Sequence, residues 1–163
     1  TETDADWGSS VLWGDRPARG QTFMTGSAKY LLYSVTIKSI GSQSANGTYT
    51  LRIGTIIGTT FTQIVSETSA TITDDVAVDD YITFVLDVPL ELNSGELYGF
   101  DIGRSGSGWN NYRNTDDSSY GSGTSYSSGS NGVGDSNIST HGFDRVFHID
   151  MAAKPNGSIL MIQ

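Results

Sequence analysis

The residues best suited to chemistry in this sequence gather in one polar stretch, residues 103–142, which mixes aromatic rings with amides and guanidinium groups. Flat rings can stack on the C–H faces of sugars, and planar polar groups can hydrogen-bond hydroxyl, carboxylate or sulfate oxygens. Rings mixed with Ser, Gly and Asn are also typical of recognition surfaces. On this basis the predicted ligand-binding residues are Trp109, Asn110, Asn111, Tyr112, Arg113, Tyr120, Arg19 and Arg104.

Catalysis is a weaker interpretation of the same residues. A small hydrolase or lyase would use His141 or His148 with Tyr and Arg, and the chain has no Cys. Gly106-Ser107-Gly108 lies in a flexible polar stretch, whereas a nucleophile elbow needs a strand-to-helix turn. We therefore predict that the protein is not an enzyme.

Acidic residues near both ends of the chain predict a structural calcium ion. Calcium takes carboxylate and carbonyl oxygens as ligands, and chain termini often lie close together. The predicted metal ligands are Asp4, Asp6, Asp144 and Asp150. The alternative is a solvated acidic surface, and no pair of acidic residues has the spacing of an EF-hand loop.

Charge and composition exclude several classes of partner. The chain has 163 residues, a net charge of -9 and a pI near 4.3. Nucleic acid and anionic membrane surfaces both require a basic footprint, so neither is expected as a partner.

The length predicts a single domain, residues 1–163, and the start at Thr1 rather than Met predicts covalently linked neighbouring domains in a larger protein.

Hydrophobic alternation supplies the elements that must position these residues. Residues 31–40, 48–57, 81–88, 96–102 and 143–151 alternate apolar and polar side chains, and shorter strands are expected at 21–24, 61–65, 68–73 and 158–163. Residues 1–20 are expected to be an irregular leader and residues 103–142 a long polar loop region on the surface. The pattern predicts an all-β protein, an antiparallel β-sandwich of jelly-roll type.

Five short segments resemble, in order, β-sandwich modules of bacterial secreted proteins: Arg19–Phe23, Leu32–Ile37, Leu92–Phe100, Tyr120–Gly123 and Asp144–His148. Such modules are appended to polysaccharide-degrading enzymes or carried by surface-anchored proteins. The resemblance covers most of residues 19–151 and implies a non-catalytic module, similar to a carbohydrate-binding module, that binds polysaccharide in a secreted or cell-surface protein. It assigns no binding residues. The alternative is a structural or adhesive surface domain.

Overall fold

The computed structural model describes residues 7–13, 18–43, 47–72, 78–106, 109–114, 120–129 and 134–155. Within strands it describes only the backbone at 7–13, 40–43, 47–48, 67–72, 78–79, 104–106 and 109–114. The described residues form strands and turns and contain no helix. Accordingly, none of them belongs to a helix long and apolar enough to cross a membrane.

Eleven strands occupy the described part of the chain. They are β1 (Trp7–Trp13), β2 (Arg19–Met24), β3 (Tyr30–Gln43), β4 (Gly47–Ile57), β5 (Thr60–Ile72), β6 (Val78–Leu92), β7 (Leu97–Gly106), β8 (Trp109–Asn114), β9 (Ser125–Ser128), β10 (Ser136–Thr140) and β11 (Phe147–Ala153).

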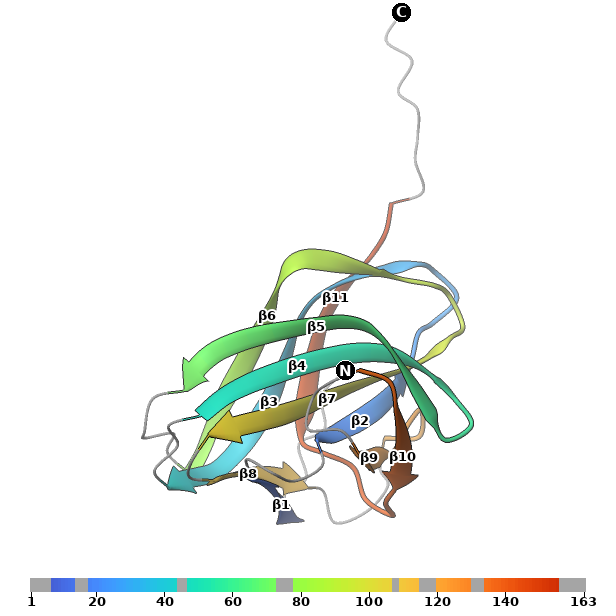
Figure 1. Ribbon diagram of the computed structural model, residues 1–163. Coiled ribbons are helices and arrows are strands. Elements are labelled where there is room, and N and C mark those ends of the chain that lie inside the picture. The colour runs from blue at the N-terminus through green and yellow to red at the C-terminus, as the bar shows by residue number, and fades with distance from the viewer. Residues whose placement is uncertain are drawn as a thin grey trace, which may run out of the picture.

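All of the strand pairs are antiparallel, and the strands divide into two groups (Figure 1). One group closes into a barrel in the order β10-β5-β4-β7-β2-β9. In the other group, the long strand β3 pairs with β6 over residues 30–40. It also pairs with β11 over residues 30–37 and with β8 over residues 39–43. Strand β1 extends this sheet beyond β8.

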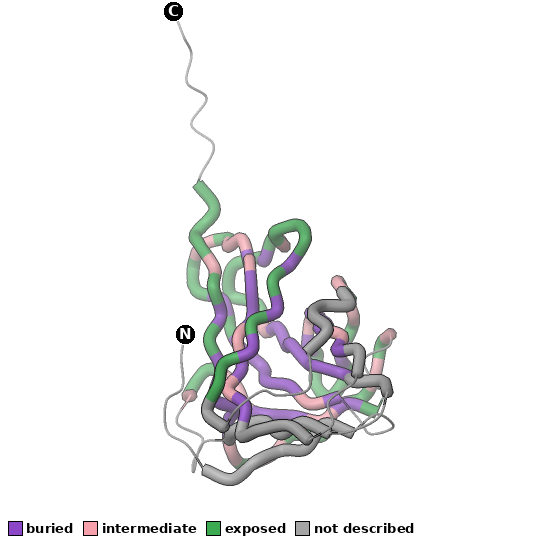
Figure 2. The backbone as a smooth tube through the Cα atoms, turned by 90° about the vertical axis from the view of Figure 1, so that its left-hand side faces the viewer, coloured by how far each residue is buried: buried purple, intermediate pink, exposed green. Residues whose placement is uncertain are grey.

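The larger hydrophobic core lies between β3, β6 and β11 on one side and β2, β4 and β7 on the other. Because successive side chains of a strand point to opposite faces, every second residue enters this core, and the alternation of buried and exposed positions is visible in Figure 2. Its fully buried members include Val35 of β3, Phe84 of β6, Leu51 of β4 and Phe100 of β7. Phe100 also meets Phe147 of β11, with ring centroids 5.5 Å apart, so the two layers are held by aromatic as well as aliphatic contacts.

A second, smaller core fills the barrel and consists of Ile56, Phe61, Tyr126 and Ile138, with Leu97 packed against it. Two glycines that face each other across β4 and β7, Gly54 and Gly99, make room for the rings. A Cβ atom on Gly54 would lie 2.6 Å from the Phe61 ring, and one on Gly99 would lie 2.8 Å from the Tyr126 hydroxyl.

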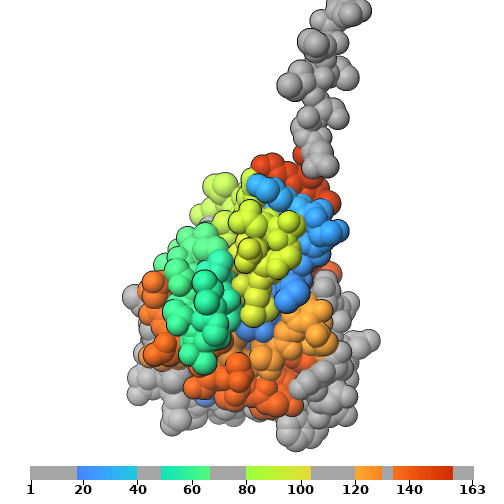
Figure 3. Space-filling model, turned by 90° about the vertical axis from the view of Figure 1, so that its right-hand side faces the viewer, coloured from blue at the N-terminus to red at the C-terminus, as the bar shows by residue number. Residues whose placement is uncertain are grey.

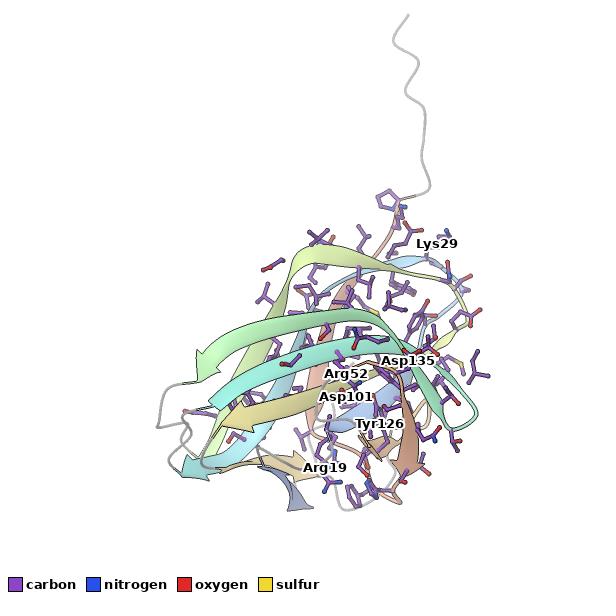
Figure 4. The ribbon with its side chains drawn as sticks, viewed as in Figure 1. Arg19, Lys29, Arg52, Asp101, Tyr126 and Asp135 are labelled. Atoms are coloured by element: carbon purple, nitrogen blue, oxygen red, sulfur yellow. The ribbon has the colours of Figure 1, made fainter. Side chains whose placement is uncertain are left out.

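An ion pair is buried beside these rings. Arg52 of β4 and Asp101 of β7 are direct cross-strand partners, and neither side chain has any solvent exposure. Arg52 donates from Nε and Nη2 to the two carboxylate oxygens of Asp101 at 2.7 and 2.5 Å, and its guanidinium lies over the Phe61 ring. Figure 4 shows the pair at the centre of the barrel. Arg52 also donates to Ser128 Oγ of β9 and to the Gly134 carbonyl, so the pair connects strands of the barrel with the segment before β10.

The structure confirms the all-β, antiparallel class and corrects the expected boundaries. The leader contains β1, and the stretch expected as a polar loop contains β8, β9 and β10. A low content of aliphatic residues does not exclude a buried strand, since β9 is buried through Tyr126 and small Ser side chains inside the barrel. Residues 61–65 and 68–72 belong to the single strand β5, whereas residue 73 and residues 158–163 lie outside the described residues. Six strands close into a barrel, which a sandwich of two open sheets does not contain, so the jelly-roll type stays a prediction.

Candidate functional site

Three segments far apart in the sequence meet at one end of the barrel: the start of β2, residues 120–125 and residues 141–146. Backbone hydrogen bonds join them, from the Thr22 N–H to the Thr124 carbonyl at 2.9 Å and from the His141 N–H to the Ser125 carbonyl at 2.9 Å. The Thr124 hydroxyl donates to the His141 carbonyl at 2.7 Å. Figure 3 shows residues 120–129 and 134–145, in orange, across the lower part of one face of the molecule.

Gln21 and Asp144 form the frame of this region. Gln21 Nε2 donates to Asp144 Oδ1 at 2.8 Å, and Gln21 Oε1 accepts the Arg145 N–H at 3.0 Å. The other carboxylate oxygen, Asp144 Oδ2, accepts the Tyr120 N–H at 2.8 Å. Gln21 and Asp144 are both fully buried. Their side chains therefore fix the backbone of all three segments relative to one another.

A row of alternating residues, His141, Phe143 and Arg145, lies beside this frame. The His141 imidazole is parallel to the Phe143 ring, with centroids 5.3 Å apart and planes at 4°. The Arg145 guanidinium carbon lies 5.2 Å from the centroid of the same Phe143 ring. His141 and Phe143 are half-buried, whereas Arg145 is buried. The row thus presents two stacked rings partly to solvent with a positive charge behind them.

Arg19, the first residue of β2, is paired with Ser127 of β9, and Ser125 of the same strand accepts the His141 N–H, so a second arginine lies on a strand beside this row. Burial lowers the pKa of His141 below its ordinary value, and the positive charges of Arg145 and then Arg19 lower it further. The imidazole is therefore neutral at pH 7. Arg19 is half-buried, and in Figure 4 it lies at the lower end of the barrel. We refer to Arg19, His141, Phe143 and Arg145 as the cationic cluster.

The structure divides the predicted ligand-binding residues between two places. Arg19 and Tyr120 lie at the cationic cluster and its frame, where Tyr120 also packs edge-on against Phe147. The other predicted residues lie at strand positions where only the backbone is described. Arg104 lies in β7 opposite Tyr49, and Trp109, Asn110, Asn111, Tyr112 and Arg113 lie in β8.

The register of β8 places a second tryptophan beside the predicted platform. Trp109 is paired with Trp13 of β1 on one side and with Gln43 of β3 on the other. Arg113 is paired with Ser9. The predicted residues of β8 therefore sit between two neighbouring strands rather than on an isolated loop.

The predicted calcium ligands are only partly within the described residues. Asp4 and Asp6 lie outside them. Asp150 is exposed on β11, and Asp144 is buried with both oxygens accepting hydrogen bonds from the protein. Among the described residues no group of three or more His, Asp or Glu side chains is placed to hold a metal ion. The calcium site thus stays a prediction.

Sequence reasoning missed Gln21, Phe143 and Arg145 as parts of a site. The signal that could have found them is the two-residue spacing of His141, Phe143 and Arg145, which in an extended chain brings side chains to one side. Two buried charges in succession, Asp144 and Arg145, carry no such signal in the sequence, because only the fold shows that they are buried.

Comparison with known proteins adds no family assignment. No protein-family model, curated protein or solved structure matches the chain significantly.

Proposed function

We propose that this protein is a non-catalytic module that binds polysaccharide. The observation that carries the proposal is the half-buried, parallel His141–Phe143 ring pair beside the guanidinium group of Arg19. Sugar recognition requires an apolar ring face together with planar hydrogen-bond donors, and this cluster offers both from well-fixed backbone. The pairing of Trp109 with Trp13 places further aromatic residues in neighbouring strands and supports the same proposal.

The absence of turnover is also part of this proposal. A hydrolase or lyase would need a proton-transfer group within hydrogen-bond reach of the reacting atoms. His141 is neutral at pH 7 and is the residue on which such chemistry would rest. However, its ring is stacked on Phe143 and its backbone is held on both sides by Thr124 and Ser125, as expected for a fixed binding surface.

The wider setting of the module is proposed on composition and resemblance alone. We propose a secreted or cell-surface protein with further linked domains, a β-sandwich of jelly-roll type for the larger layer pair, and a structural calcium ion near the chain ends. The setting and the linked domains belong to the module type that the five quoted segments resemble, the jelly roll follows from the strand alternation, and the calcium ion follows from the acidic residues near both chain ends.

Affinity gel electrophoresis against a panel of neutral and acidic polysaccharides tests the proposal. We expect at least one polysaccharide to retard the protein relative to a reference protein of similar size and charge. A matched Phe143→Ala variant should lose retardation, because it removes the ring face shared by His141 and Arg145. Normal mobility of the wild-type protein in every gel would favour the structural or adhesive alternative.

A further inference from the structure

The cationic cluster is a local exception to the charge of the protein. The whole chain carries a net charge of -9, yet Arg145 lies over the Phe143 ring on which His141 is stacked, and Arg19 begins the strand paired with β9, whose Ser125 carbonyl accepts the His141 N–H. The described carboxylate next to them, Asp144, is fully buried and accepts hydrogen bonds from Gln21 and the Tyr120 N–H. Neither Asp144 oxygen therefore lies at the surface, and its negative charge offsets part of the positive charge of Arg145.

We propose that Arg19 and His141 form a subsite for an oxyanion, the carboxylate or sulfate group of an acidic polysaccharide. This inference rests on the proposed polysaccharide-binding function and names its substrate class. It predicts that the protein prefers acidic glycans to neutral glycans of the same backbone.

The chemistry of the two residues fits an oxyanion. A guanidinium group presents five N–H donors in a planar fork that matches the oxygens of a carboxylate or sulfate group. Arg19 is half-buried, and its backbone is paired with Ile102 of β7 and Ser127 of β9. The half-buried imidazole of His141 supplies one further N–H donor, and its stacking on the Phe143 ring holds the imidazole plane in place.

Arg145 acts from behind this surface. Only 1% of its side chain is exposed, and its guanidinium group packs against the Phe143 ring and the Gly20 carbonyl. It therefore favours a bound anion through its charge rather than through direct contact. A charge in such a protected position is screened by salt much less than an exposed one.

Nuclear magnetic resonance of the two histidines tests the oxyanion subsite without a glycan. Wild-type protein is titrated with sodium sulfate, with sodium chloride at equal ionic strength as the reference. We expect the imidazole signals of His141 to shift saturably with sulfate, while those of His148, which is exposed on β11, follow the chloride reference. Arg19→Gln should remove the saturable shift, and Lys29→Gln should keep it.

Lys29→Gln is a matched control because it also removes one positive charge, in this case from an exposed side chain. Lys29 is bound to Glu91 and lies far from Arg19 in Figure 4. Arg19→Lys keeps the charge but removes the planar fork, and it should retain a weaker response. Melting curves of all variants establish that each is folded. Equal shifts of both histidines in wild-type protein, or an unchanged response in folded Arg19→Gln, would overturn the subsite.

Paired polysaccharides then identify the source of the oxyanion. Dextran sulfate is compared with dextran, and polygalacturonate with its carboxyl-reduced form, by affinity gel electrophoresis. We expect retardation by an acidic member and at least about tenfold weaker binding for Arg19→Gln, the scale of losing a hydrogen bond to a charged group. Which acidic polymer retards the protein distinguishes sulfate from carboxylate.

The outcomes separate this inference from the proposed function. Equal retardation by charged and neutral partners, unaffected by Arg19→Gln, would overturn the oxyanion subsite and leave polysaccharide binding intact. A saturable, Arg19-dependent response to sulfate without retardation by any polysaccharide would support the oxyanion subsite and overturn the proposed polysaccharide binding.

Discussion

Arg52 and Asp101 face each other across β4 and β7 inside the barrel, joined by two hydrogen bonds of 2.7 and 2.5 Å and with no solvent exposure. Burial raises the pKa of Asp101 above its ordinary value, while the hydrogen bonds and the positive charge of Arg52 oppose that rise. The barrel interior is thus built around a charge pair that has no contact with solvent.

Breaking this pair should destabilise the protein strongly. Asp101→Asn keeps the shape of the side chain but leaves the Arg52 guanidinium buried without a counter-charge, which typically costs about 3–5 kcal/mol. Denaturant unfolding measures the loss. The exposed ion-pair variant Glu91→Gln should unfold almost like wild type, because Glu91 is exposed. A double variant, Arg52→Leu with Asp101→Leu, should be less destabilised than Asp101→Asn. A similar unfolding midpoint for Asp101→Asn and wild type would contradict the role of the pair.

Stability should decrease as the pH falls below neutrality. Burial and the charges of Arg145 and Arg19 lower the pKa of His141, whereas in the unfolded chain a histidine titrates near about 6.5. Below that value the unfolded chain binds a proton that the folded protein does not, so stability is lost until the folded pKa is passed.

Melting temperatures between pH 5 and 7.5 check this dependence. His141→Gln should have a flatter profile than wild type, and His148→Gln, changed at an exposed position, should not. Parallel profiles for wild type and His141→Gln would show that His141 does not contribute.

Trp109 remains the predicted aromatic platform of β8. Truncating a hot-spot aromatic costs on the order of 2 kcal/mol, about a thirtyfold loss of affinity. Trp109→Ala should therefore abolish retardation in the polysaccharide gel that retards wild type. Tyr81→Ala, which truncates an exposed ring on β6, serves as the matched control and should bind normally. Normal binding by Trp109→Ala, or loss of its folded state, would remove Trp109 from the glycan surface.

Calcium should raise the melting temperature if the acidic residues at the chain ends share an ion. Chelator should lower it, and added calcium should restore it by mass action. Asp150→Ala is the informative variant because Asp150 is exposed and its loss removes no core contact. Asp150→Ala or Asp6→Ala, each as a single change, should remove the response to calcium. Identical melting curves with and without chelator would leave these residues as surface charge.

Incubation with polysaccharide should release neither reducing ends nor unsaturated products. The assay uses the same polymers as the binding gels, so that a bound polymer is also tested as a substrate. Product release that is abolished by His141→Ala or His148→Ala would assign an enzymatic function instead.

The sequence alone determined the class of the fold and most of its central strands. Alternation in residues 31–40, 48–57 and 81–88 predicted the regions of β3, β4 and β6, because half-buried strands require apolar residues at every second position. It also predicted Arg19 and Tyr120 as site residues. The strand content of the polar stretch could not be predicted in this way, because alternation of aliphatic residues does not detect strands such as β9, whose buried residues are Ser and Tyr.

Only the tertiary structure decided which distant residues act together. Gln21 and Asp144 are 123 residues apart, and nothing local indicates that their side chains are joined by a hydrogen bond. Likewise, Arg52 reads in the sequence as the outward residue of an amphipathic strand, yet the closed barrel turns that outer face into a second interior. Period two shows that a strand has two faces, but the burial of each face depends on which strands pair around it.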